Sequence, residues 1–340
     1  MTLRLTVSLN EWRAHQRALL AEVPGAVPVA KGNGYGFGLD LLAKEATNLR
    51  TDALAVGIAQ EVPKVRSAGW LRDVVVLNPW RPGDLAATDL LADPRAITMV
   101  SRARDLEAIK RSHPHARVQL EMQTSMHRHG LVAGDLPLDL GTLQFEGWSI
   151  HLPSVGSLKE ATELASKALT CRRGAIWMSH LSVADYRVFR TSVGVQTRMR
   201  IGTRLWLGAP SALRTTANIL DIHRIRRGER LGYHQSSVPR DGFLVIASGG
   251  TAQGIALAAP VPQRTLRQRG VTITEGVLEA AGKSLSPFSI GGRKRPFAEP
   301  PHMHSSMLWV AGNDPGVEVG EEIPVTCRMT TTTFDEVTLA

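Results

Sequence analysis

The chain has 340 residues, 43% of them hydrophobic and only 5% aromatic, which is enough to bury a large core built mainly from aliphatic side chains. Its net charge of +9 is spread along the sequence, which favours anionic small ligands or simple solubility over nucleic-acid binding. Cys171 and Cys327 are too far apart in sequence to indicate a disulfide framework or a zinc site, and no segment has the pattern of a signal peptide or a membrane span. We therefore expect a cytoplasmic protein that binds neither a membrane nor nucleic acid.

Short apolar, β-branched runs recur through the first 205 residues, and the segments between them have the apolar spacing of amphipathic helices. The predicted strands are Val27–Ala30, Ala53–Ile58, Val74–Leu77, Ile97–Val100, Val118–Met122, Trp148–His151, Ala175–Met178 and Met199–Leu205. Clear helical segments include residues 39–50, 59–70 and 103–112. This alternation predicts an α/β fold, a (β/α)8 barrel of the TIM type, over residues 1–212, although the first few residues could instead join a second domain.

The pattern changes after about residue 213. Helical segments become rare, and short strand-like runs alternate with turn residues, as in GFLVIASGG (242–250), RGVTITEG (269–276) and SSMLWVAG (305–312). We therefore expect a mostly-β C-terminal domain over residues 213–340. Within it, residues 282–300 are rich in Gly, Pro and basic side chains and are predicted to form a loop.

Charged side chains stand at the ends of several predicted barrel strands, where the chemistry of such barrels is located. Lys31 ends the first strand, Glu121 lies near the end of the fifth with Arg128 in the loop beyond, His151 ends the sixth, Ser179 and His180 end the seventh, and Arg200 lies on the eighth. One such residue is usually a solvated end charge, but a lysine, two arginines and a histidine together predict a site for an anionic cofactor. A lysine amine among cations loses its proton more easily and can form a Schiff base with an aldehyde such as pyridoxal phosphate.

The segment AKGNGYGFG (30–38) resembles the pyridoxal-lysine segment of the alanine racemase family, the barrel-type (fold type III) pyridoxal-phosphate enzymes. Lys31, Asn33, Tyr35 and Gly36 match its characteristic positions. The resemblance implies that pyridoxal 5'-phosphate is bound covalently by Lys31, with Tyr35 among its contacts. It also implies an amino-acid racemase, with the interconversion of L- and D-alanine as the first expectation.

Other segments extend the resemblance in the same order along the chain: MQTSMHRHGL (122–131), FEGWSIHLPS (145–154), TRMRIGTRLWLG (197–208) and ERLGYHQ (229–235). By resemblance, Arg128 hydrogen-bonds the phenolic oxygen of the cofactor and contacts substrate, His151 lies over the cofactor ring, and Arg200 faces the pyridine nitrogen. Arginine stays protonated and can only donate, so it keeps that nitrogen unprotonated and weakens the ring as an electron sink. Such a ring suits proton exchange at Cα better than transamination.

The resemblance also implies a phosphate site and a second catalytic base. The amides of Gly202 and Thr203 would bind the phosphate, as would Ser182 in the more loosely matching segment WMSHLSVA (177–184). Tyr233 matches the catalytic tyrosine, so removal of a proton by Lys31 from one face and its return by Tyr233 from the other would invert the amino acid. In the family this tyrosine enters the partner's site, which implies a head-to-tail homodimer with shared active sites.

Several positions depart from the family pattern. Gly32 and Gly34 replace alanines, and Glu121 occupies the position often held by a carbamylated lysine. We expect the Glu121 carboxylate to orient Arg128 through charge-assisted hydrogen bonds without modification.

Two further departures lie in the C-terminal domain. Phe334 replaces a tyrosine that touches the phosphate, so one phosphate hydrogen bond, typically about 1 kcal/mol, would be lost. Met303 matches the methionine that lines the substrate entry, but His304 replaces the aspartate that follows it. Both changes affect substrate choice and rate more than cofactor binding.

Two alternatives stay open beside the racemase. One is another pyridoxal-dependent reaction on the same fold, as in a decarboxylase or a D-amino-acid lyase. Arg200 argues against a decarboxylase, since that class usually places a carboxylate at the ring nitrogen. The other is a non-catalytic pyridoxal-binding homologue, which Phe334 and His304 favour and the retained pair of Lys31 and Tyr233 disfavours. The sequence leaves the preferred amino acid open.

Overall fold

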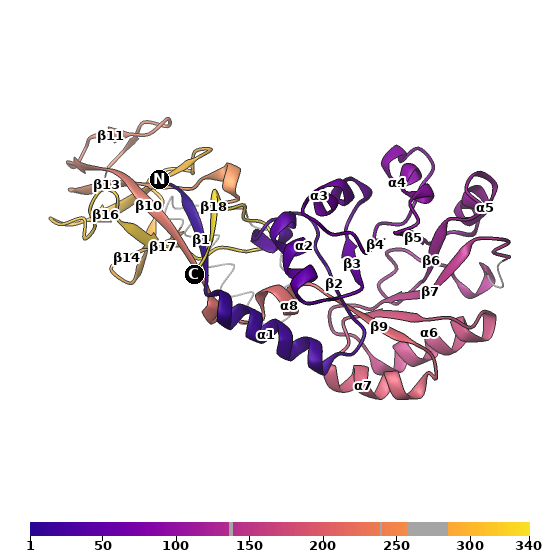
Figure 1. Ribbon diagram of the computed structural model, residues 1–340. Helices are drawn as coiled ribbons and strands as arrows, with labels where there is room; N and C mark the ends of the chain where they lie inside the picture. The colour runs from indigo at the N-terminus through magenta and orange to yellow at the C-terminus, as the bar shows by residue number, and fades with distance from the viewer. Residues whose placement is uncertain (136–138, 239, 258–284) are drawn as a thin grey trace. The chain divides into compact units, whose positions relative to one another are not determined.

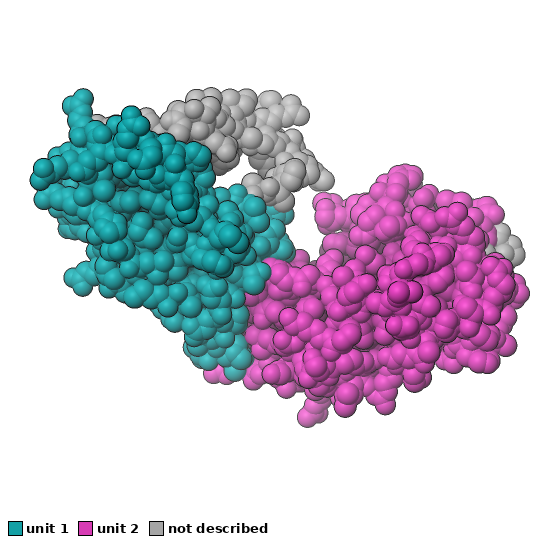
Figure 2. All heavy atoms as spheres, turned by 90° about the horizontal axis from the view of Figure 1, so that it is seen from above, with its two compact units in different colours: residues 1–9, 210–340 teal, residues 10–209 magenta. Residues whose placement is uncertain are grey.

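The computed structural model describes residues 1–135, 139–238, 240–257 and 285–340. The chain divides into two compact units, Asn10–Ala209 and Met1–Leu9 with Pro210–Ala340 (Figure 2). The predicted strand at 269–276 lies outside the described residues. Within them, no helix combines the length and the apolar character needed to cross a membrane.

The unit Asn10–Ala209 is an eight-stranded parallel barrel with helices around it, which confirms the predicted fold (Figure 1). Its strands are β2 (Ala26–Pro28), β3 (Ala53–Val56), β4 (Asp73–Val76), β5 (Ala96–Val100), β6 (Arg117–Met122), β7 (Gln144–His151), β8 (Ile176–Ser179) and β9 (Thr197–Ile201). They are hydrogen-bonded in the order β2-β9-β8-β7-β6-β5-β4-β3. A parallel bridge between Val29 and Ala55, with the Ala30 amide donating to the Ala55 carbonyl at 2.8 Å, joins the two ends of this sheet.

Helices connect the barrel strands, as the apolar spacing of these segments predicts. They are α1 (Leu9–Glu22), α2 (Leu39–Asn48), α3 (Val62–Ser67), α4 (Leu85–Asp89), α5 (Ala103–Ser112), α6 (Leu158–Cys171), α7 (Val183–Ser192) and α8 (Thr203–Leu207). The eighth strand is shorter than predicted, because it ends at Ile201 and Thr203 begins α8. Leu205, the predicted end of that strand, is instead a buried residue of α8, and its neighbour Trp206 donates its indole N–H to the Val29 carbonyl at 2.8 Å.

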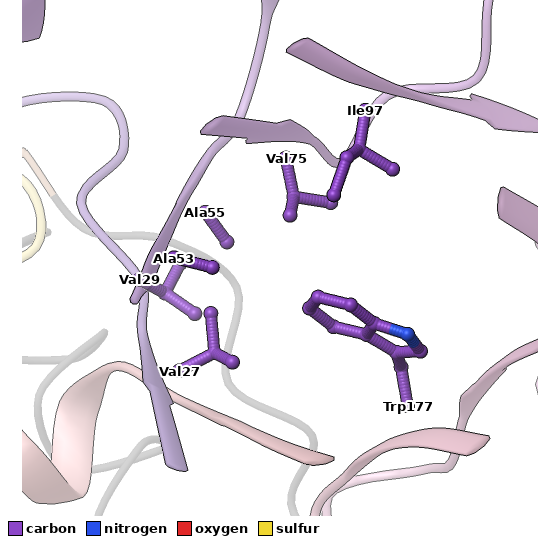
Figure 3. Packing of buried hydrophobic residues seen from close by; sticks show 7 residues of the cluster. All are labelled: Val27, Val29, Ala53, Ala55, Val75, Ile97 and Trp177. Carbon is purple, nitrogen blue, oxygen red and sulfur yellow. The ribbon is translucent and has the colours of Figure 1, made fainter. Parts of the chain in front are cut away.

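The barrel interior holds an apolar cluster of side chains from β2, β3, β4, β5 and β8 and the residues next to them (Figure 3). Its buried members are Val27, Val29, Ala53, Ala55, Val75, Ile97 and Trp177. Ion pairs lie near the N-terminal ends of the strands: Arg117 binds Asp73 at 2.8 Å and Glu146 at 2.7 Å, and Arg198 binds Asp52 at 2.7 Å. This packing leaves the C-terminal ends of the strands for functional side chains.

The second unit is mostly β structure, as the sequence predicts. Its strands are β1 (Leu3–Val7), β10 (Leu213–Ile225), β11 (Arg230–Leu231), β12 (Ser236–Ser237), β13 (Gly242–Ser248), β14 (Leu285–Ile290), β15 (Arg293–Pro296), β16 (Ser305–Ala311), β17 (Glu322–Pro324) and β18 (Glu336–Leu339). Five of them form the order β16-β13-β10-β1-β18, and β17 also pairs with β10.

The prediction of a loop over residues 282–300 is wrong for its described part. β14 and β15 form an antiparallel hairpin there. Gly291 and Gly292, with φ of +59° and +71°, make its two-residue turn, a backbone conformation that glycine adopts without steric cost.

Candidate active site

Lys31 follows the end of β2, with Val29 and Ala30 between them, and begins a loop whose backbone repeatedly turns into the left-handed region. Gly32, Gly34 and Tyr35 have φ of +61°, +63° and +55°. A β-carbon on Gly34 would lie 2.8 Å from the Leu39 amide nitrogen. The two glycines that depart from the family pattern therefore suit this loop, because each has a backbone conformation that side chains disfavour.

The Lys31 amine lies in a predominantly cationic environment. The residue is exposed as a whole, yet partial desolvation lowers the pKa of its ammonium, and Arg128 and Arg200 lower it further. Glu61 opposes this shift. A lysine whose pKa is lowered has more of the neutral amine, which is the form that attacks an aldehyde or accepts a proton.

Arg200 is a buried cation on β9 with unused hydrogen-bonding capacity. It is 7% exposed, and burial lowers its pKa to about 10, with Arg128 adding to that effect and Glu121 opposing it. One guanidinium nitrogen lies 3.5 Å from the Ile150 carbonyl, while Nε has no partner among the described residues. A buried donor of this kind is costly unless something accepts from it, so Arg200 is suited to an acceptor atom of a bound molecule.

Glu121, on β6, is buried, and this burial raises the pKa of its carboxyl, although Arg200 and Arg128 oppose the shift. Its Oε2 has no hydrogen-bond partner within the described part of the chain. The expected charge-assisted hydrogen bond to Arg128 is not formed between these two described residues, and that part of the prediction is wrong. Arg128 is exposed in the loop after β6 and acts on Glu121 only through its charge.

His151 ends β7 and is held on both sides. Its Nδ1 is hydrogen-bonded to the Ser179 hydroxyl at 2.7 Å, and its carbonyl accepts from the Thr124 hydroxyl at 2.9 Å. The His180 ring meets it edge-on at 5.1 Å between centroids. Burial, followed by Arg200 and Arg128, lowers the pKa of His151 to about 2, so its imidazole is neutral.

The loop residue Tyr35 meets the start of α8. Tyr35 is 6% exposed, and burial, followed by Glu61, raises its pKa to about 12. A β-carbon on Gly202 would lie 2.0 Å from the Tyr35 hydroxyl oxygen, so only glycine fits there without displacing the ring. The predicted cofactor contact Tyr35 therefore lies beside Gly202, which with Thr203 is predicted to bind the phosphate.

The predicted phosphate ligand Ser182 has a structural role in this chain. It caps α7, with its hydroxyl accepting from the Asp185 amide at 3.0 Å and donating to the Asp185 carboxylate at 2.7 Å. A phosphate would have to displace Asp185 from that hydroxyl.

Tyr233 and Met303 belong to the second unit, where both side chains are exposed, Tyr233 to 83%. The Tyr233 ring lies 4.6 Å from that of His302, centroid to centroid. His302 Nε2 in turn lies 2.6 Å from a carboxylate oxygen of the buried Glu299. The backbone next to Tyr233 packs closely against Glu299, since a β-carbon on Gly232 would lie 2.0 Å from a carboxylate oxygen of Glu299.

Ser179 and His180 lie at the strand end where the sequence predicts them. His180 also has a φ of +62°, the type of backbone strain that accumulates at functional sites. Glu61 and His302 are potential site residues that the sequence does not indicate, because the contacts that bring them to Lys31 and Tyr233 join positions distant in the chain.

Comparison with known proteins supports the resemblance. Residues 7–170 match the family model for the alanine racemase N-terminal domain. An alanine racemase of Citrifermentans bemidjiense is 26% identical over 147 residues, which are 39% of this chain and only 38% of that relative. An alanine racemase of Sorangium cellulosum is 23% identical over 362 aligned residues, covering 94% of this chain and 87% of the relative.

The fold is also that of solved structures. The alanine racemase from Bartonella henselae, with covalently bound pyridoxal phosphate, superposes with a TM-score of 0.74 at 15% identity, and the match covers 100% of both chains. The alanine racemase from E. faecalis gives a TM-score of 0.71 at 17% identity over 99% of this chain and 98% of the other. At these identities the likeness concerns the fold.

Proposed function

We propose, from the premise that this chain is a member of the alanine racemase family, that it is a pyridoxal-phosphate-dependent amino-acid racemase with alanine as its first substrate. The observation that carries the proposal is the buried, unpaired Nε of Arg200 in the same barrel as a lysine of lowered pKa. A pyridine nitrogen is the kind of acceptor that this guanidinium lacks.

The barrel residues fit pyridoxal phosphate. Lys31 would hold its aldehyde carbon, Arg200 would donate to its ring nitrogen, and Tyr35 with the amides of Gly202 and Thr203 would bind its phosphate. When bound, the cofactor supplies an electron sink that acidifies the Cα proton of an amino acid. His151, held neutral, can pack on the ring without adding a charge beside Arg200.

Proton transfer is assigned to Lys31 and Tyr233. The lowered pKa of Lys31 lets its neutral amine take a proton from one face of Cα, and the Tyr233 hydroxyl donates one to the other face. Arg128 would fix the substrate carboxylate and the cofactor's phenolic oxygen through two-pronged donation. The exposure of Tyr233 is consistent with its use in the active site of a second copy, so we include a head-to-tail homodimer in the proposal. The enzyme would act in the cytoplasm, where its two free cysteines would stay reduced.

The test is proton NMR of the protein loaded with pyridoxal phosphate, in D2O, with L-alanine, L-serine and other L-amino acids, followed by chiral analysis. Loss of the Cα proton signal together with the D-enantiomer would support racemisation and identify the substrate. Release of carbon dioxide or loss of the amino group would favour a decarboxylase or lyase. Binding of the cofactor to Lys31 without exchange for any amino acid would favour a non-catalytic homologue and refute the racemase.

A further inference from the structure

Glu61 is the carboxylate that contacts the loop behind Lys31. Its Oε1 accepts from the Gly32 amide at 2.6 Å, the residue that follows the lysine. Its Oε2 accepts from the amides of Gly57 at 2.6 Å and Ile58 at 3.3 Å, at the end of the neighbouring strand β3. One side chain therefore ties the ends of two adjacent barrel strands together at the lysine.

The packing around this carboxylate is close. A β-carbon placed on Gly57 would lie 3.1 Å from the Lys31 β-carbon and 3.1 Å from Glu61 Oε2. Lys31 and Glu61 thus pack closely around Gly57, and a larger residue at Gly57 would fit only if these neighbours shifted. Hydrogen bonds from amides to an ionised carboxylate are stronger than neutral ones, so the position of the Gly32 amide is well defined.

We propose that Glu61 is a positioning residue for Lys31, which fixes the lysine's loop on β3 and places a carboxylate charge near the amine. This inference rests on the proposed function, because it assigns Lys31 the covalent and proton-transfer role. Its chemistry is simple: three amide donors hold the carboxylate against the loop, and its charge opposes that of the two arginines at the lysine.

The charged and titratable groups that face Lys31 have opposing effects. Arg128 and Arg200 lower its pKa, and Glu61 raises it. Lys31 in turn contributes to the lowered pKa values of His151 and His180, which face it from β7 and the end of β8. Without the Glu61 charge, only the two arginines would act on Lys31, and its pKa would be lower. More of the amine would then be neutral, but it would hold an accepted proton less strongly.

The experiment compares wild type with Glu61→Gln, which keeps the acceptor geometry and removes the charge. The control is Asp93→Asn, which likewise keeps an acceptor and removes a carboxylate charge; Asp93 accepts from the Arg95 amide at 2.8 Å just before the start of β5, whereas Lys31 follows the end of β2. In apoprotein, Lys31 is labelled by reductive methylation with formaldehyde and quantified by peptide mass spectrometry between pH 6 and 10. We expect labelling of Lys31 at neutral pH to be on the order of threefold or more faster in Glu61→Gln, and unchanged in Asp93→Asn.

Identical Lys31 labelling profiles in wild type and Glu61→Gln would overturn the inference. Trapping of pyridoxal phosphate on Lys31 with borohydride, done in parallel, tests the proposed function separately: failure of trapping with normal methylation would reject the cofactor role and leave the Glu61 result valid. If Glu61→Gln does not fold, the rate of hydrogen exchange at the Gly32 amide in wild type tests whether that amide is hydrogen-bonded to Glu61. Slow exchange at this exposed position supports the bond to Glu61, and unprotected exchange refutes it.

Discussion

The histidine that ends β7 gives a test of the site's electrostatics that needs no cofactor. Burial, Arg200 and Arg128 lower the pKa of His151 from 6.5 to about 2, so the folded protein keeps it neutral at pH values where the unfolded chain protonates it. Below pH 6.5 the unfolded state therefore binds more protons, and stability must fall as the pH falls. The contribution is fully present above pH 6.5 and is lost progressively toward pH 2.

The magnitude follows from proton linkage. Each pH unit below 6.5 lowers the free energy of unfolding by up to about 1.4 kcal/mol through this one residue. Between pH 7.5 and 5.5 the wild-type apoprotein should thus lose about 1.4 kcal/mol more than His151→Gln, whose side chain can keep a hydrogen bond to Ser179 but cannot titrate. His180 also lowers the pKa of His151, but folded His151 stays neutral over this pH range, so replacing it should leave the titration of His180 alike in both proteins.

The assay is urea unfolding followed by circular dichroism at several pH values, with the slope of free energy against pH compared between the two proteins. Comparing slopes removes any constant packing cost of the substitution. Parallel pH profiles for wild type and His151→Gln would refute the reasoning, since they would mean that His151 binds its proton equally in the folded and unfolded states.

Three further substitutions test the ion pairs, the phosphate end and the tyrosine support. Arg117→Met should cost about 2 to 4 kcal/mol in urea unfolding, because it leaves Asp73 and Glu146 without their partner, whereas Lys159→Ala, from an exposed pair at 3.9 Å, should cost less than about 0.5 kcal/mol. Gly202→Ala should weaken pyridoxal-phosphate binding in an equilibrium titration by about tenfold or more, since its β-carbon meets the Tyr35 hydroxyl, while Gly134→Ala, with no atom within 4 Å, should bind normally. His302→Ala should lower kcat about tenfold with little change in KM, because Tyr233 loses the ring packed against it. His302→Phe keeps a flat ring there and should recover most of the lost kcat. Equal losses of kcat in both variants would reject this packing role.

Much of the barrel is readable from the sequence because its strands are buried on both faces and appear as continuous apolar runs. The approach of Lys31, His151 and Arg200 is predictable for the same reason, since parallel strands of a barrel end on one side. Boundaries fail where apolar residues change role: Leu205 continues an apolar run but packs from a helix. The hairpin β14–β15 is not predicted because Pro287 and the basic residues indicate a loop, although Gly291 and Gly292 suit a two-residue hairpin turn.

Side-chain pairing is harder to predict, because it depends on packing that sequence spacing does not encode. Glu121 and Arg128 are seven positions apart in sequence, yet the structure buries the first and exposes the second. Glu61 meets Gly32 across 29 positions through a loop of glycines whose conformations decide the contact. The sequence thus identifies which residues gather at the barrel end and leaves their partners to be found in the structure.

The charges at this end of the barrel favour an anionic ligand. Lys31, Arg128 and Arg200 act on one another as like charges, and each of the two carboxylates that oppose them is limited. Glu61 is committed to three amides, and burial raises the pKa of Glu121, which reduces its capacity to neutralise Arg200. Among the described residues, this leaves a surplus of positive charge and the Nε donor of Arg200 without a partner in a partly buried site, which is unfavourable. A phosphate and a ring nitrogen would remove both costs at once, so binding of the cofactor should stabilise the barrel as well as equip it for catalysis.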